Sequence, residues 1–260
     1  MANIDKHPAG SFCWIELHTT DQNAAKSFYN SLFGWQAQDM PMGPDEFYTF
    51  FNLGDRSAAA GCTLRPDERS MGVPPHWMIY ITVDNTDAAV AKAQQLGGTV
   101  LAPGFDVMDA GRMAVVQDPT GAVFCVWQPN KSHGIGVAHV HGTLCWADLS
   151  TADPKRASDF YSGLFGWQLI TDPKDPSGYL HIKNGEHHIG GIPPAAHRQP
   201  GVPPHWMAYF LVDDVDATAN KAKEMGAKLH LPPMSMEGVG RMSVIADPQG
   251  AVFAIFKSAR

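Results

Sequence analysis

The 260-residue sequence lacks an excess of basic charge, and this narrows the classes of partner. Lys and Arg number 19 against 26 Asp and Glu, which gives a formal net charge of −7 at pH 7. No basic run occurs along the chain. Nucleic-acid binding draws its affinity from clustered Lys and Arg that face the phosphate backbone. We therefore expect no nucleic-acid partner.

Long apolar runs and paired cysteines are also missing. No apolar stretch approaches the roughly 20 residues that a membrane-spanning helix needs, and the N-terminal residues lack the pattern of a secretory signal peptide. The four cysteines, Cys13, Cys62, Cys125 and Cys145, show no C-x-x-C spacing and stand among apolar neighbours. Such cysteines are typical of reduced thiols. We expect a cytoplasmic protein with no membrane partner.

What the sequence does contain is an internal repeat. Three pairs of segments match: residues 10–36 with 142–168, 72–85 with 201–214, and 111–127 with 240–256. The first pair is identical at 14 of 27 positions with an offset of 132, and the other two pairs share an offset of 129. A period this long indicates that each copy is a whole domain rather than a stacked repeat unit.

The boundary between the copies falls in a polar stretch with glycines, which is typical of a linker. We expect one domain over residues 8–130, a linker over 131–139 and a second domain over 140–258. Because both domains lie in one chain, we expect a monomer or a homodimer.

Within each copy the hydrophobic pattern alternates between strand-like and helix-like periods. In the first copy it predicts these elements: strands near 12–18, 47–53, 57–64 and 77–83, helices after Asp21 and over 86–96, and closing strands over 112–117 and 122–127. Asp21 is suited to cap its helix and Gly34 to end it. Each copy reads β-α-β-β-β twice, so we predict an α+β protein of four βαβββ modules.

Three motifs recur within this order: T-x-D-x-x-x-A-x-x-F-Y-x-x-L-F-G-W after the first strand, V-D-D/N before the second helix, and D-P-x-G-A before the last strand. Together they resemble the vicinal oxygen chelate superfamily, which includes glyoxalase I, bleomycin-resistance proteins and extradiol dioxygenases. The resemblance covers nearly the entire chain and is closest to the two-domain, glyoxalase-like branch. It implies two domains with curved mixed sheets around cavities. Since this scaffold hosts lyases, isomerases, dioxygenases and drug binders, it implies no single activity.

The enzymes of this superfamily hold a divalent metal through four slots, which the resemblance places by counting from the motifs. The slots fall on Trp14, Met78 and Cys125 and near Gly61 in the first copy, and on Trp146, Met207 and Ala254 and near Gly191 in the second. Hard divalent cations prefer carboxylate, imidazole or amide ligands, which these positions do not offer. We therefore expect no metal and no other cofactor, with a divalent metal as the alternative.

Alternation at period 2 places one set of first-strand residues on a single face in each copy: Trp14, Glu16 and His18, and then Trp146, Asp148 and Ser150. Because Trp14 and Trp146 fall on the family's metal slots, the resemblance implies that this face points toward the cavity. Glu16, His18 and Asp148 are therefore the candidate catalytic residues, since a carboxylate there could bind a ligand hydroxyl or act as a general base. The alternative is that both carboxylates bond neighbouring strand backbone.

The candidate ligand-binding residues share the parity or the slots of that face: Trp14, His76, Met78, Tyr80, Cys125, Trp146, His205, Met207 and Tyr209. Trp14 and Trp146 are suited to stacking on a ligand, although large aromatics are also ordinary core residues. His76 and His205 could supply acid-base chemistry near neutral pH. Their alternative role is to bond a loop carbonyl after the two prolines.

These features favour a glyoxalase/bleomycin-resistance-like protein that binds a small, partly aromatic molecule in strand-lined cavities without metal. The alternative is a metal-dependent lyase or dioxygenase, glyoxalase I-like or extradiol dioxygenase-like. A third possibility is an interaction protein that keeps the fold as a scaffold.

Overall fold

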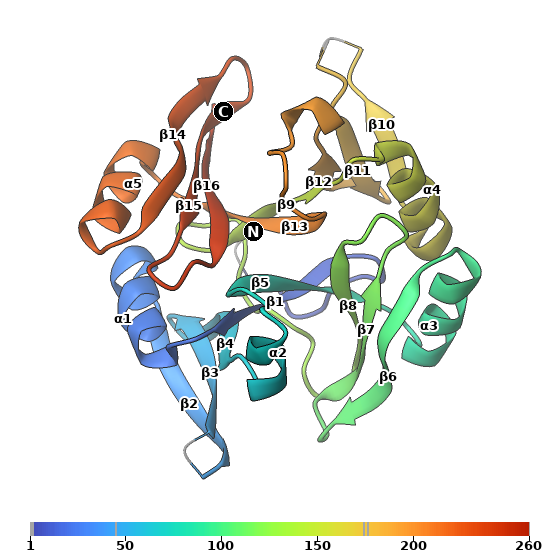
Figure 1. Cartoon of the computed structure of the whole chain (residues 1–260), viewed down its shortest axis with the longest axis horizontal. Coiled ribbons are helices and arrows are strands. Elements are labelled where there is room, and N and C mark those ends of the chain that lie inside the picture. The colour runs from blue at the N-terminus through green and yellow to red at the C-terminus, as the bar shows by residue number, and fades with distance from the viewer. Residues whose placement is uncertain (1–2, 45, 174, 176, 260) are drawn as a thin grey trace.

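The structure is a computed structural model, and it describes residues 3–44, 46–173, 175 and 177–259. The first half of the chain folds as two βαβββ modules (Figure 1). The first module comprises β1 Phe12–Thr19, α1 Gln22–Phe33, β2 Gln36–Gly43, β3 Glu46–Leu53 and β4 Arg56–Thr63. The second comprises β5 His76–Thr82, α3 Thr86–Gln95, β6 Thr99–Val107, β7 Gly111–Gln117 and β8 Val123–Pro129. A short helix, α2 Pro66–Ser70, connects them.

The second half repeats this order. Its first module comprises β9 Leu144–Ser150, α4 Pro154–Phe165, β10 Gln168–Thr171, β11 Leu180–Asn184 and β12 His187–Ile192. Its second comprises β13 His205–Leu211, α5 Val215–Glu224, β14 Lys228–Met236, β15 Gly240–Ala246 and β16 Val252–Ser258, and the 3-10 turn η1 Ala195–His197 joins the two. The predicted α+β architecture of four modules is confirmed.

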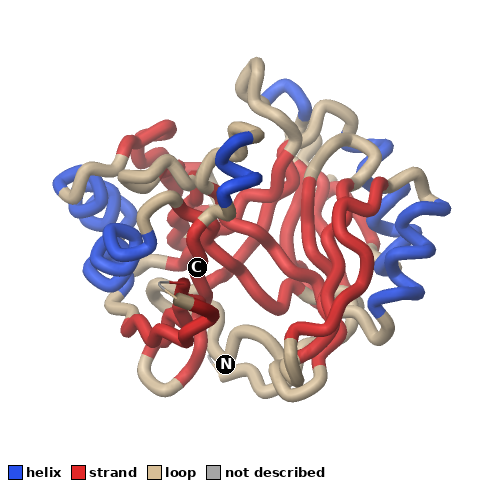
Figure 2. Tube along the Cα trace, turned by 60° about the horizontal axis from the view of Figure 1, so that its bottom comes forward, coloured by secondary structure: helices blue, strands red, loops and turns tan. Residues whose placement is uncertain are grey.

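Each half forms one eight-stranded mixed sheet. The strand order is β2-β3-β4-β1-β5-β8-β7-β6 in domain 1 and β10-β11-β12-β9-β13-β16-β15-β14 in domain 2, so neither sheet closes into a barrel. The central strands β1 and β5 are antiparallel, while β1 and β4 are parallel. Figure 2 shows the strands filling the middle of the molecule, with the long helices at its two sides.

We call the face of each sheet that packs against its two long helices the helix face, and the opposite face the open face. On α1, Ala25, Phe28 and Leu32 are buried, as their spacing predicts. Trp77 on β5 lies beneath this helix and donates its indole N–H to Tyr29 at 3.1 Å. The helix face therefore forms the hydrophobic core.

The ends of α1 are the predicted ones. The Asp21 carboxylate accepts the backbone N–H of Ala24 at 2.9 Å, and Gly34 closes the helix with φ of 74°. That left-handed conformation favours glycine. Asp153 and Gly166 do the same for α4.

Two edge strands, β2 and β6, were not among the strands that the hydrophobic pattern predicts. Both lie at the ends of the first sheet, and most of their residues are at least partly exposed. Pro41 and Pro103 stand within them. Proline lacks a backbone donor, so it is tolerated on edge strands and weakens the strand signal in the sequence.

The two domains exchange hydrogen bonds through the repeated motifs. Helix α1 lies beside α5, and α3 lies beside α4 (Figure 1). The hydroxyl of Tyr29 donates to Asp247 in the other domain at 2.9 Å, and Tyr161 donates to Asp118 at 3.0 Å. The F-Y motif of each domain thus bonds the D-P-x-G turn of the other.

Two tryptophans add to this interface. Trp35 donates its indole N–H to the carbonyl of Gly142 at 2.8 Å, and Trp167 donates to Gly10 at the same distance. Each tryptophan ends an L-F-G-W motif. The strongest identity between the copies therefore serves packing of one domain on the other.

The connecting segment packs on domain 1. Ile135 is buried, and its N–H donates to Cys13 at 2.7 Å. Gly136 donates to Ser57 at 2.7 Å. Within the described part of the chain, no helix has the length and apolar character needed to cross a membrane.

Candidate functional site

A buried carboxylate stands at the centre of the open face of domain 1. Glu16 on β1 is only 7% exposed. Tyr48 from β3 donates a short hydrogen bond to one of its oxygens, and Tyr80 from β5 donates to the other at 3.1 Å. Three strands of one sheet, β1, β3 and β5, therefore fix this side chain.

His18 completes the cluster, because residues two apart on a strand share a face. Its Nε2 lies 2.9 Å from Glu16 Oε1. This is an ion-pair contact rather than an aligned hydrogen bond, since neither ring nitrogen of His18 has a hydrogen-bond partner. The ring of His76 stacks on it with centroids 4.8 Å apart. The thiol of Cys62 on β4 approaches the same Glu16 oxygen at 3.8 Å.

The cluster favours charge on both Glu16 and His18. Burial opposes ionisation of His18, but its contacts with Cys62 and Glu16 outweigh burial and raise its pKa to about 10. Burial also opposes ionisation of Glu16, yet His18, Tyr48 and Tyr80 together lower the pKa of this carboxyl. The result is a buried carboxylate–imidazolium pair at neutral pH.

Trp14 extends the cluster toward a hollow. Its indole N–H donates to Tyr48 at 3.0 Å, so the sequence Trp14, Tyr48, Glu16 forms a hydrogen-bonded chain. Phe50 packs edge-on against Trp14 with ring centroids 6.0 Å apart. Phe50 also lines a hollow of about 400 Å³ at the outer part of the sheet.

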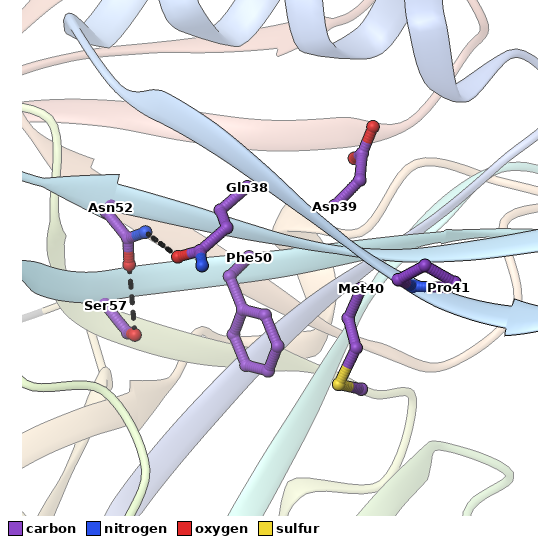
Figure 3. Close-up of a pocket in the computed structure, with 7 residues that line it drawn as sticks. All are labelled: Gln38, Asp39, Met40, Pro41, Phe50, Asn52 and Ser57. Atoms are coloured by element: carbon purple, nitrogen blue, oxygen red, sulfur yellow. Dashed lines mark hydrogen bonds between the residues drawn. The ribbon is translucent and has the colours of Figure 1, made fainter.

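Figure 3 shows this hollow, whose lining residues are Gln38, Asp39, Met40, Pro41, Phe50, Asn52 and Ser57. Phe50 and Met40 point to the same side of the sheet, while Asp39 points away (Figure 3). Asn52 accepts from Ser57 at 3.1 Å. The hollow thus combines apolar side chains with uncharged polar groups. It borders the buried carboxylate through Phe50 and Trp14 instead of enclosing it.

Domain 2 repeats the carboxylate with a different surrounding. Asp148 is 7% exposed and accepts hydrogen bonds from Tyr179 at 2.5 Å, Tyr209 at 2.8 Å and Trp146 at 3.0 Å. Ser150 takes the place of His18. The carboxylate therefore has three neutral donors and, among the residues that the structure describes, no ion-pair partner.

This difference changes the electrostatics. Burial raises the pKa of Asp148, and the hydrogen bonds from Tyr179, Tyr209 and Trp146 offset only part of that effect. In domain 1 the imidazolium of His18 tips the balance the other way. The partners of Glu16 therefore lower the pKa of that carboxyl, whereas burial raises the pKa of Asp148.

The structure brings the predicted site residues together. Met78 pairs with Glu16 across β1 and β5, and Met207 pairs with Asp148. Cys125 lies next to Tyr80 in the register of β5 and β8 and is 1% exposed. Met78 and Met207 are thus the cross-strand partners of the two carboxylates, Tyr80 and Tyr209 donate hydrogen bonds to them, and His205 lies opposite Ser150.

Three expectations need correction or refinement. The carboxylates bond tyrosine hydroxyls and indole or imidazole groups, so the alternative of strand backbone as partner is wrong. His76 and His205 do bond loop carbonyls, at 2.9 Å from Pro74 and Pro203. This agrees with their alternative role.

The third refinement concerns the fourth metal slot. A side chain at Gly61 would point at Phe51 on the helix face, whereas one at Gly191 would overlap Tyr179 on the open face. Ala60 pairs with Glu16 as Gly191 pairs with Asp148. The two glycines are therefore not equivalent.

Three residues of the clusters were not predicted: Tyr48, Cys62 and Tyr179. Tyr48 and Tyr179 recur at an offset between those of the two sets of matched segments, so neither fixed offset aligns them. A search that allowed a gap between the first helix and the third strand would have paired them. Cys62 has no thiol counterpart in the second copy, so the repeat carries no signal for it.

The residues at the family's metal slots do not fit a hard divalent cation. The indole N–H of Trp14 donates a hydrogen bond to Tyr48. Cys125 is deeply buried, and burial raises the pKa of its thiol. Met78 offers only a thioether, which is a poor ligand for such ions. We therefore derive no chemistry from a metal at these slots.

Comparison with known proteins defines the family. The model of the Glyoxalase/Bleomycin resistance protein/Dioxygenase superfamily matches residues 11–126 and 137–255. The chain therefore belongs to this superfamily. Among its relatives, "Putative glyoxylase CFP32" of Mycobacterium tuberculosis is 41% identical over 263 residues, which cover 100% of this chain and 99% of the relative.

A second relative is the "Anthracycline biosynthesis protein DnrV" of Streptomyces peucetius, which is 32% identical over 95% of this chain and 92% of its own. Among solved structures, the Mn(II)-bound glyoxalase from Novosphingobium aromaticivorans has a TM-score of 0.66 at 17% identity, over 98% of this chain and 83% of that one. The 2,3-dioxygenase LapB from Pseudomonas sp. KL28 has a TM-score of 0.66 at 14% identity, over 95% and 92%. At these identities the likeness concerns the fold.

Proposed function

We propose that this protein binds a small, partly aromatic molecule on the open faces of its sheets, without a metal at the family's slots. The observation that carries the proposal is the hollow of about 400 Å³ beside Phe50 and Trp14 in domain 1. Small-molecule pockets in proteins have volumes of roughly 300–1,000 Å³ and combine apolar walls with a few polar groups. The volume and the lining of this hollow fall within that description.

The lining indicates the chemistry of the ligand. Phe50 and Met40 offer an aromatic ring and a polarisable thioether, which suit a planar ring system. Gln38, Asn52 and Ser57 supply amide and hydroxyl groups that recognise ligand hydroxyls or carbonyls. The relative named for anthracycline biosynthesis supports a polycyclic aromatic ligand.

Glu16, His18 and Asp148 are the proposed acid-base groups, should the bound molecule react. His18 keeps the Glu16 carboxylate ionised and lowers its pKa, so this group is suited to accept hydrogen bonds from a ligand and is a weak base. Burial raises the pKa of Asp148, which moves this carboxyl toward the range in which a general acid or base works.

Binding is tested by titrating chelator-treated protein with planar hydroxylated aromatics, such as hydroxyanthraquinones, and following heat or fluorescence. We expect saturable binding that Phe50→Ala weakens at least about tenfold, because this removes an aromatic contact. Phe47→Ala is the matched control, since it lies on the same strand with the opposite parity and is 43% exposed. Equal affinities of the two variants and the parent would contradict the proposal.

A metal-dependent lyase or dioxygenase is the second candidate, and one group of residues favours it. Ligand atoms of Glu16, His18 and Cys62 lie within 4.8 Å of one another. This candidate predicts that Ni²⁺, Zn²⁺, Mn²⁺ or Fe²⁺ confers turnover of hemithioacetals or catechols. Absence of turnover with every one of these ions would exclude it for those substrates.

A further inference from the structure

We propose that domain 1 binds one borderline divalent cation of the Zn²⁺ type through Glu16, His18 and Cys62. This site is distinct from the family's slots, which fall on other residues of the same sheet. It goes beyond the proposed ligand binding, which needs no metal, and it does not depend on it.

The strand register assembles the three donors. Glu16 and His18 stand two apart on β1 and so project from the same face. Cys62 pairs with His18 across the parallel strands β1 and β4. The carboxylate oxygen, an imidazole nitrogen and the sulfur consequently lie within 4.8 Å of one another. Two central strands hold them, so little rearrangement is needed to close the site.

The buried imidazole of His18 is the second observation. Its side chain is only 16% exposed, its Nε2 lies 2.9 Å from Glu16 Oε1, and its Nδ1 has no hydrogen-bond partner. Buried polar nitrogens in folded proteins are normally bonded, and an exception calls for an explanation such as an ion that is bound there. A cation that takes the lone pair of one nitrogen satisfies this ring. In its absence, a proton on His18 supplies the positive charge beside Glu16.

The donor set selects the class of cation. A carboxylate, an imidazole and a thiolate together suit Zn²⁺, Co²⁺ and related ions, whereas Mg²⁺ and Ca²⁺ prefer oxygen ligands alone. Three protein donors leave one position free in a tetrahedral shell, as in catalytic zinc sites. Binding releases the proton of His18 and the thiol proton of Cys62, because the metal requires the neutral imidazole and the thiolate.

Tyr48 and Tyr80 are the supporting residues of this site. Both donate hydrogen bonds to the Glu16 carboxylate and hold its orientation from β3 and β5. Outer hydrogen bonds of this kind orient metal-ligating carboxylates and raise metal affinity. The two tyrosine hydrogen bonds are thus suited to orient Glu16 both in the ion pair with His18 and in the metal site.

Domain 2 is a control built into the same chain. Ser150 matches His18, and by the pairing of Asp148 with Gly191, Pro193 matches Cys62. Asp148 keeps its tyrosine partners but has neither imidazole nor thiol at the matching positions. The proposal therefore predicts one ion per chain rather than two.

The test is a titration of the chelator-treated full chain with Zn²⁺ and with Co²⁺. We expect one ion of either kind per chain, and a near-ultraviolet charge-transfer absorption from Co²⁺ bound to thiolate. Cys62→Ser should abolish that absorption and weaken Zn²⁺ binding at least about 100-fold, since loss of an outer partner alone costs 10–100-fold. Cys145→Ser is the matched control, because Cys145 is a half-buried thiol of domain 2, and it should change neither readout.

A readout in the parent chain keeps the test decisive if Cys62→Ser fails to fold. Bound Zn²⁺ should protect Cys62, and not Cys145, from alkylation, as followed by mass spectrometry. The proposal is overturned by titrations that show no stoichiometric ion. It is equally overturned if the ion survives both Cys62→Ser and His18→Asn, or is lost instead with the exposed pair His187 and His188. Ligand binding is measured without metal, so its failure and the failure of this site are separate results.

Discussion

On the open face of each domain two tyrosines bond a buried carboxyl, and the two carboxyls differ in the direction of their pKa shifts. Glu16 and Asp148 each accept hydrogen bonds from two tyrosines on neighbouring segments of the sheet. His18 gives Glu16 a cationic partner, whereas Ser150 leaves Asp148 without one. Duplication therefore preserved the tyrosine hydrogen bonds to the carboxylate, while the residue at the position of His18 contributes to the direction in which the pKa of the buried acid shifts. The same fold thereby holds two buried carboxyls whose pKa values shift in opposite directions.

We expect the largest difference in stability between variants of the two domains when each carboxylate is replaced by its amide. Glu16→Gln removes the carboxylate that keeps His18 ionised, so the folded state loses this buried ion pair and its free energy of unfolding should fall by about 3 kcal/mol. Asp148→Asn replaces a carboxyl whose charge burial disfavours, so its effect should be smaller, within about 1 kcal/mol. Urea unfolding of both variants at pH 7 measures the difference. Equal losses would show that the two carboxylates have the same ionic state.

The contacts between the domains should respond alike in both halves. Tyr29→Phe removes a hydroxyl bonded to Asp247, and Tyr161→Phe removes its counterpart bonded to Asp118. Each loss should cost about 2 kcal/mol, because a buried hydrogen bond to a carboxyl group disappears. Thermal and urea unfolding check this. A large difference in stability between the two variants would show that the two halves of the interface do not contribute equally.

Stability should also depend on pH through domain 1. The folded pKa of His18 is raised from 6.5 to about 10, so its contribution is fully present below pH 6.5 and is lost as pH rises toward 10. Chelator-treated protein should lose at most about 1.4 kcal/mol per pH unit in that window from this one proton. His18→Asn should flatten this part of the profile, measured by urea unfolding at pH 6 to 9.5. A profile that the substitution leaves unchanged would contradict the raised pKa.

The smallest effect is expected at two matched surface ion pairs. Arg112 contacts Asp87 at 2.9 Å, and Arg241 contacts Asp216 at 2.5 Å, each joining a strand to the helix of its module. Arg112→Ala and Arg241→Ala should each cost less than about 1 kcal/mol, because exposed ion pairs are screened by solvent. Urea unfolding at low and high salt measures both. A loss of several kcal/mol in either domain would show that its ion pair is not merely a surface contact.

Much of the fold could be predicted because the repeat and the caps are local signals. Asp21 and Gly34 mark the ends of α1, and alternation along β1 puts Glu16 and His18 on the face opposite the core. The edge strands β2 and β6 escaped prediction because exposure and proline weaken the hydrophobic alternation there. The repeated F-Y and D-P-x-G motifs are visible in the sequence. The sequence does not show that these motifs form hydrogen bonds with each other between the domains.

The sequence by itself determined the tandem duplication, the four modules and the parity of Trp14, Glu16 and His18, because these depend on identity and period along the chain. Only the tertiary structure decided what surrounds the carboxylate. Tyr48 and Cys62 come from strands that reach β1 through pairing across the sheet, and such register is not encoded in any local spacing. The charge of Glu16 depends on those partners, since burial alone would favour the neutral acid. The ionic difference between the two domains is therefore a property of the assembled sheets.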